Sequence, residues 1–305
     1  MSAADFLRPR PRRRGSIDPA PSGWYAAPAL VFFTAFALIP ILAVLALSFT
    51  TWNGLGPIEF EGLTSWQQVL TSSVTLNALV VTGKIMLFSL VVQLPISLLL
   101  GTWSAGPQRG RALLAVIFFV PLLLSSAAIA IAFKALLDPN FGLGGSSGLD
   151  VLAQNWLGDP DLVLFVVVFV IAWQFIPFHT LIYQGGVKQI PGSLYEAADL
   201  DGAGRIKQFF HVTLPQLKYT IITSTTLMVV GSLTYFDLIF VLTAGGPGYA
   251  TRLLPLHMYI TGFEGTAMGA ASALGVILVV IGLVLALLLQ RLGGKDRTAS
   301  QTEGI

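Results

Sequence analysis

The sequence predicts an all-α integral membrane protein with six transmembrane helices, and three observations support this fold class. Of the 305 residues, 54% are hydrophobic and only 10% are charged, whereas a soluble globular domain carries about 25% charged residues. Six apolar stretches are each near or above the ~20 residues that a helix needs to cross a bilayer. Basic residues gather in alternate connections between these stretches. Because lipid offers no partner to an unpaired backbone group, such spans are expected to be helical.

Residues 1–23 are polar and rich in proline and arginine. We expect a disordered basic tail here, on the cytoplasmic side. The first span follows at about 24–49, too long for the ~7–15 apolar residues of a signal peptide. The other spans are predicted at 76–102, 111–137, 161–184, 217–243 and 267–290.

These six spans make residues 24–291 one transmembrane domain, and residues 292–305 a second cytoplasmic tail. Lysine and arginine dominate the N-terminal tail, the loops at 103–110 and 185–216, and the C-terminal end, whereas the alternate loops are richer in acid. The positive-inside rule therefore predicts a multi-pass protein of the plasma (inner) membrane with both termini in the cytoplasm. Internal prolines predict local kinks in the spans; they are Pro40, Pro95, Pro121 and Pro177.

Several kinds of chemistry are excluded by the sequence. The chain has no cysteine, which removes disulfides and thiolate sites. Gly83-Lys84 and Gly294-Lys295 lack the first glycine and the hydroxyl of a phosphate-binding loop. If nucleotide powers this protein, another chain binds it, and nothing indicates a nucleic-acid partner.

The cytoplasmic loop at 190–215 carries unusually many structural signals. Ser193 and Glu196 have the spacing of a capping box, so a helix is expected to start at about Leu194. Gly202 suits the end of that helix.

A second short helix is expected after Gly202. Its residues Ile206, Phe209 and Phe210 follow the i, i+3, i+4 spacing of one apolar face, and Leu214-Pro215 ends it. Such a face either fits the groove of a protein partner or lies on the inner leaflet, and the residues alone favour neither.

In this loop, Glu196-Ala197-Ala198 is followed after three residues by Gly202, and after nine more by Val212-x-Leu214-Pro215. This pattern resembles the EAA loop of binding-protein-dependent ABC importer permeases. The departure is Val212, where isoleucine is usual. Three further segments resemble the MalF-like carbohydrate branch of that family: Trp173-Gln174 through Pro177, Phe236-Asp237-Leu238, and 242–248.

The resemblance implies the type I ABC importer permease fold, with the loop as the helix that couples the spans to an ATPase. Glu196, Ala197, Ala198, Gly202, Leu214 and Pro215 would then serve ATPase coupling, beside the apolar face of Ile206, Phe209 and Phe210. The implied partners are a second homologous permease subunit, an ATPase dimer that holds ATP and magnesium, and an extracytoplasmic solute-binding protein. This chain would bind no cofactor or metal, contain no catalytic residue, and pass a sugar-like solute; a non-sugar such as a glycerophosphodiester stays open.

Polar residues within the spans are the candidates for the solute path. They are Lys84, Gln93, Trp173, Gln174, Tyr235 and Asp237. The alternatives are a structural Lys84–Asp237 ion pair, a lysine that reaches outwards, and interhelical packing by tryptophan and glutamine.

Two other classes of protein fit the sequence less well. A stand-alone ion-coupled transporter usually shows internal repeats and discontinuous helices at matching positions, and no clear repeat is visible here. A membrane-embedded enzyme would need a catalytic or metal cluster, and the sequence offers none. Neither class explains the EAA-like loop.

Overall fold

The computed structural model describes residues 23–106, 118–144 and 154–292. It divides into two compact units, Met1–Ala43 and Val44–Ile305. The first contains a 3₁₀ turn η2 (Gly23–Ala26), helix α1 (Ala27–Phe33) and a π-helical turn η3 (Thr34–Leu38). Helix α2 (Ile39–Leu47) continues from it into the second unit. The wide turn precedes Pro40, whose missing N–H breaks the regular α-helical hydrogen-bond ladder.

Four helices in the described part of the chain are long and apolar enough to cross a membrane. They are Trp24–Leu47, α4 (Ser73–Ala105), α8 (Val163–Val187) and α15 (Met268–Leu292). They coincide with the predicted spans at 24–49, 76–102, 161–184 and 267–290. The prediction of an all-α, multi-pass membrane protein is therefore confirmed.

The other two predicted spans are interrupted. Within 111–137, residues 118–123 are helical, Leu124 and Ser125 are not, and α6 covers Ser126–Leu136; residues 107–117 lie outside the description. Within 217–243, α12 (Lys218–Ser232) and α13 (Asp237–Leu242) are separated by residues 233–236. The prediction of one continuous helix is therefore wrong for 217–243 and for the described part of 111–137. The count of six spans is not confirmed.

Hydroxyl side chains hydrogen-bond to the backbone at both interruptions. The Ser125 hydroxyl accepts a hydrogen bond from the Ala128 backbone N–H at 3.2 Å and so starts α6. The Ser232 and Thr234 hydroxyls donate to the carbonyls of Val229 and Gly231, at 2.7 and 2.8 Å. Such local bonds compete with the helical ladder and give the chain a way out of the helix without unpaired carbonyls.

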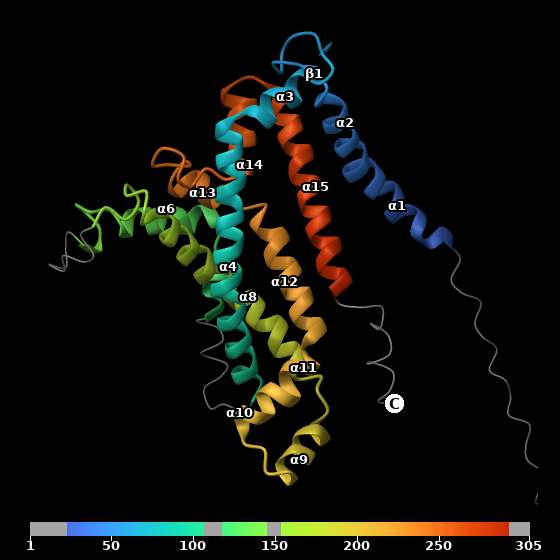
Figure 1. Ribbon diagram of the computed structural model, residues 1–305, viewed down its shortest axis with the longest axis vertical. Coiled ribbons are helices and arrows are strands. Elements are labelled where there is room, and N and C mark those ends of the chain that lie inside the picture. The colour runs from blue at the N-terminus through green and yellow to red at the C-terminus, as the bar shows by residue number, and fades with distance from the viewer. Residues whose placement is uncertain (1–22, 107–117, 145–153, 293–305) are drawn as a thin grey trace, which may run out of the picture. The chain divides into compact units, whose positions relative to one another are not determined.

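The remaining elements lie at the two ends of the second unit (Figure 1). A short antiparallel pair, β1 (Thr50–Thr51) with β2 (Glu59–Phe60), lies with α3 (Thr64–Thr71) at one end. Helix α14 (Leu254–Tyr259) and the π-helical turn η5 (Ile260–Glu264) lead into α15. The opposite end holds α9 (Gly192–Leu200), α10 (Arg205–Gln208), the π-helical turn η4 (Phe209–Thr213) and α11 (Leu214–Gln216).

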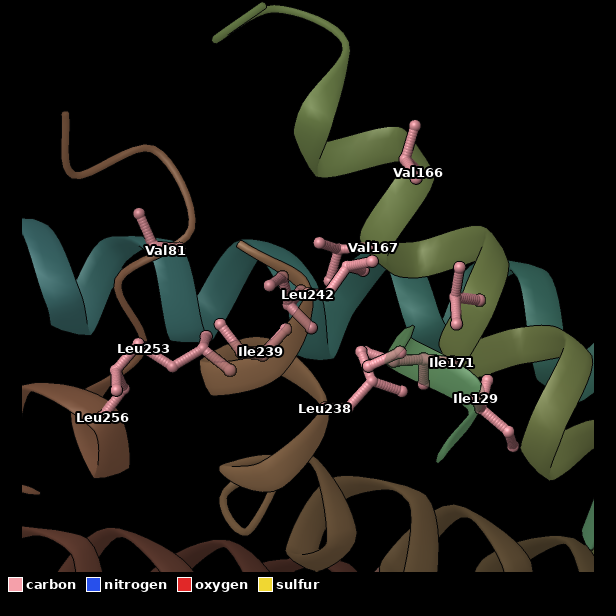
Figure 2. Packing of buried hydrophobic residues seen from close by; sticks show 13 residues of the cluster. Val81, Ile129, Val166, Val167, Ile171, Leu238, Ile239, Leu242, Leu253 and Leu256 are labelled. Carbon is pink, nitrogen blue, oxygen red and sulfur yellow. The ribbon is translucent and has the colours of Figure 1, made fainter. Parts of the chain in front are cut away.

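The largest buried cluster in the described part of the chain joins α4, α6, α8, α13, α14 and Leu253 just before α14. Figure 2 shows Leu242 and Leu238 of α13 beside Val167 and Ile171 of α8. Since Ile239 and Leu242 are almost fully buried, the short helix α13 belongs to the core. The short helices of the interrupted segments are thus held in place by packing against their neighbours.

Helices α4 and α8 make the most extensive helix–helix contact, and Gly101 marks a close approach between them. A methyl group at Gly101 would lie 2.6 Å from the Tyr183 Cβ and 2.9 Å from the Thr180 carbonyl oxygen. Only glycine allows the two backbones to come this near.

We expect Gly101→Ala to lower the melting temperature of the purified protein, because overpacking of this kind costs about 1–3 kcal/mol. Gly83→Ala is the matched control in the same helix, since a methyl group there would meet nothing within 4 Å. Thermal unfolding followed by size-exclusion chromatography measures both. Equal melting temperatures would show that α4 and α8 do not approach as closely as described.

Candidate functional site

The loop between α8 and α12 folds as two short helices joined by a tight turn. Helix α9 ends at Leu200, and Gly202 follows it with a left-handed φ of +71°. The N–H of Ala203 donates to the Ala198 carbonyl at 2.8 Å, and that of Gly202 to the Asp199 carbonyl at 3.0 Å. This pair of bonds is a Schellman ending, which favours glycine at the left-handed position. The predicted role of Gly202 in ending the helix is confirmed.

Side-chain bonds fix the two short helices to each other. The Gln208 amide donates to the Asp199 carboxylate and to the Ala203 carbonyl. The hydroxyls of Tyr195 and Thr213 are hydrogen-bonded at 2.9 Å. The loop between α8 and α12 is therefore a folded unit and not an open connection, and it is called the knob below.

An apolar cluster anchors the knob to the long helices. Leu98 of α4, Tyr183 of α8 and Leu217 are buried at its centre, and the loop packs against them through Ile190, Phe209 and Leu214. The knob is thus packed directly against the neighbouring ends of α4 and α8.

The expected capping box does not form. Helix α9 begins at Gly192, two residues earlier than expected, with Pro191 at the N-cap and no side-chain cap. Pro191 has φ −58° and ψ 131°, which supplies the non-helical N-cap geometry. Ser193 and Glu196 consequently fall inside the helix, where Glu196 is exposed and available to a partner.

The three predicted residues of the second apolar face also do not share one face. Ile206 and Phe210 are 76% and 56% exposed, whereas Phe209 packs into the anchoring cluster. The wide turn η4 starts at Phe209 and departs from the α-helical spacing on which the prediction relied. Leu200, 91% exposed, adds to the apolar surface of the knob, and the sequence analysis missed it.

A second candidate site is a cavity of about 440 Å³ beside the two helix interruptions. This volume lies within the ~300–1,000 Å³ usual for small-molecule sites. Four aromatic rings and four polar side chains line it, with apolar side chains and Gly231 between them. The rings belong to Phe175, Phe178, Tyr235 and Phe236, and the polar groups to Ser126, His179, Thr234 and Asp237.

Two of these polar groups are held by side chains outside the cavity. The Gln174 amide donates to the Ser126 hydroxyl at 3.1 Å, and the ring Nδ1 of His179 is hydrogen-bonded to the Ser224 hydroxyl at 2.9 Å. Gln174 and His179 are both buried. The cavity therefore offers preset hydrogen-bonding groups beside flat apolar faces.

The structure brings only part of the predicted solute path to this cavity. Tyr235 and Asp237 line it, and Gln174 reaches it through Ser126. Trp173 lies outside the lining and packs edge-on against Phe133, with ring centroids 5.4 Å apart. Gln93 is buried behind the lining, and a solute role for it or for Trp173 stays a prediction.

Lys84 is exposed on α4 and does not line the cavity. Both it and Asp237 are described, and no ion pair joins them. The lining residues that the sequence analysis missed include Phe175, Phe178, His179 and Thr234. The first two are three residues apart on one face of α8, beside Pro177, and this spacing was the available signal.

Comparison with known proteins identifies the class. Residues 19–295 match the family described as binding-protein-dependent transport system inner membrane component. The chain belongs to this family. Among curated relatives, it is 34% identical to the probable ABC transporter permease protein YurN of Bacillus subtilis (strain 168), over 87% of this chain and 92% of that one.

Another relative is the arabinooligosaccharides transport system permease protein AraP of the same organism. It is 28% identical, over 93% of this chain and 98% of that one. In fold, the chain resembles a subunit in the crystal structure of a bacterial alginate ABC transporter bound to a periplasmic protein that carries an alginate pentasaccharide. The TM-score is 0.77 at 20% identity, over 90% of this chain and 96% of that one. The type I importer permease fold is thereby confirmed.

We expect Gly202→Val to reduce ATP-driven uptake, because a branched side chain at φ +71° disfavours the Schellman ending by about 1–2 kcal/mol. Gly204→Val is the matched control: Gly204 has φ −65° and ψ 166°, which any residue adopts, and open space around it. Uptake into vesicles by the complete transporter measures both variants. The same uptake in both would show that the shape of this turn is unimportant for transport.

Proposed function

We propose that the chain, as the permease subunit of an ATP-binding-cassette importer, passes an uncharged sugar or sugar-like polyol through the cavity beside α13. The observation that carries this proposal is the lining of aromatic rings interleaved with preset polar groups. A pyranose has an apolar face that stacks on such rings and a rim of hydroxyls that bind such groups. The name of the relative AraP, an arabinooligosaccharide permease, supports the same class of solute.

The charges at the cavity favour a neutral solute over an anionic one. Among the described residues that line the cavity, Asp237 carries the one carboxylate, and none is lysine or arginine. Lys84, which could have attracted an anion, lies elsewhere. A glycerophosphodiester would bring its phosphate towards a carboxylate with no cation beside it, so this alternative is disfavoured.

The proposed assembly contains a second homologous permease subunit, an ATPase dimer and an extracytoplasmic solute-binding protein. The ATPase would hold ATP and magnesium, and this chain would hold neither. We place both termini and the knob in the cytoplasm, as the distribution of basic residues indicates. The family to which the chain belongs is named for its dependence on binding proteins, which supports the external partner.

The knob is the proposed contact with the ATPase. Glu196, Ala197 and Pro215 are exposed, as are Ile206 and Phe210. Ala198 accepts the Schellman bond that shapes the turn at Gly202, and Leu214 packs inward with Phe209. The first group would touch the partner, and the second would carry its movement into α4 and α8.

Purification of the tagged chain from native membranes in mild detergent tests the assembly, and uptake by the reconstituted complex tests the solute. We expect an ATPase, a second permease and a binding protein to co-purify, and neutral sugar to enter liposomes only with ATP. A chain that purified alone and moved solute without ATP would instead be a secondary transporter.

We expect Phe178→Ala to reduce solute-stimulated ATPase activity by about fivefold or more, because loss of an aromatic contact with the solute costs at least about 1 kcal/mol. Trp173→Ala, which removes a ring of α8 outside the cavity, is expected to reduce it less. A larger loss in Trp173→Ala than in Phe178→Ala would move the solute site away from this cavity.

Asp237→Asn is expected to weaken discrimination against anions. Two like charges 4 Å apart repel by roughly 4 kcal/mol at an effective dielectric constant of about 20. The uptake ratio of a uronic acid derivative to its parent neutral sugar should therefore rise about tenfold or more in the variant. An unchanged ratio, with both sugars delivered by the same binding protein, would show that Asp237 does not face the solute.

A further inference from the structure

Gln93 is the most unusual buried polar residue in the described part of the chain. It lies within α4, its exposed fraction is 0%, and neither its amide nitrogen nor its amide oxygen has a hydrogen-bond partner. No other described residue has two buried polar side-chain atoms without a partner. An amide can donate two hydrogen bonds and accept two. Burying all of them unmade is unfavourable, so the position of Gln93 requires an explanation.

Tyr235 stands between Gln93 and the cavity. Its side chain lines the cavity, whereas Gln93 does not. The Tyr235 hydroxyl also interacts with the Gln93 amide, but no hydrogen bond of full length and angle joins the two groups. One aromatic side chain thus separates an unpartnered amide from the space where the solute is proposed to bind.

Tyr235 packs on one side against the largest buried cluster, and its other surroundings leave space around the side chain. Residues 233–236 are not helical, so Tyr235 is free of the rotamer limits of a helix. Gly231 presents no side chain, and a methyl group there would lie 4.0 Å from the Tyr235 hydroxyl. The ring contact is with Phe175, at 5.5 Å between centroids.

We propose that Tyr235 closes a concealed subsite, and that the Gln93 amide binds hydroxyl groups of the solute when the ring turns aside. This inference rests on the proposed function, because it assumes a solute rich in hydroxyls. An amide suits such a solute, since it donates to one hydroxyl and accepts from the next. Binding the solute gives the amide the partners that it lacks in the closed arrangement, and therefore favours the open position of the ring.

The first test uses the lack of cysteine in the native chain. A thiol introduced by Gln93→Cys, in the complete transporter, is exposed to a small, charged methanethiosulfonate reagent. Labelling should be slow with Tyr235 present and about tenfold faster or more with Tyr235→Ala, because reaction follows exposure of the thiol. Ser89→Cys is the matched control: it is 1% exposed on the same helix, also without a partner, and should stay slow in both backgrounds.

Slow labelling of Gln93→Cys in the Tyr235→Ala background would show that the Tyr235 ring does not close access to position 93. This test does not depend on the solute, so it decides about the gate even if the transporter imports something other than a sugar.

The second test is uptake, and it tests the role of the Gln93 amide even if the Tyr235→Ala transporter fails to assemble. Gln93→Leu keeps the size of the side chain and removes the amide. We expect uptake to fall about tenfold while the amount of assembled transporter is unchanged, because a solute hydroxyl then meets an apolar surface. Gln93→Asn should restore part of the loss, and Ser89→Ala should show none. Wild-type uptake by Gln93→Leu would make Gln93 a packing residue, without affecting the proposed function.

Discussion

The structure depends on one constraint, which is that backbone polar groups in a membrane need partners within the protein. Long helices satisfy it along most of the chain. At residues 124–125 and 233–236 the helices stop, and the hydroxyls of Ser125, Ser232 and Thr234 take over the hydrogen bonding. These interruptions leave the cavity between them, since irregular backbone at membrane depth is tolerated where it is buried or lines a cavity. The proposed solute site thus exists because the chain can leave the helix without unpaired carbonyls.

Helix α8 connects this cavity with the knob. Phe175, Phe178 and His179 line the cavity, and Tyr183, one turn further along, lies at the centre of the cluster that anchors the knob. The close backbone approach at Gly101 ties the same part of α8 to α4. In the proposed function, a displacement of the knob would reach the cavity through these two tightly packed helices. Helix α8 is continuous from the cavity to the knob. This is the mechanical property that coupling to an ATPase requires.

Prediction from the sequence succeeded where one local signal sufficed. Apolar length gave four spans, and Gly202 marked the end of α9 through its left-handed backbone. It failed where two signals competed. The spacing of Ser193 and Glu196 fitted a capping box, but Pro191 already supplied the N-cap, and the wide turn at Phe209 altered an apolar face that had been read at α-helical spacing. The prediction of a continuous fifth span failed because hydropathy measures apolar length and does not show where a helix stops.

The sequence by itself determined the class of protein, because composition, apolar length and the 190–215 loop are local properties of the chain. The comparison with relatives agrees with that assignment. Only the tertiary structure decided which polar residues face a common space. Tyr235 and Asp237 line the cavity, Lys84 does not, and Gln93 lies concealed behind the lining. The physical reason is that the orientation of a side chain depends on which helices pack against its own, and on where those helices break. Both are set by contacts between residues far apart in the sequence.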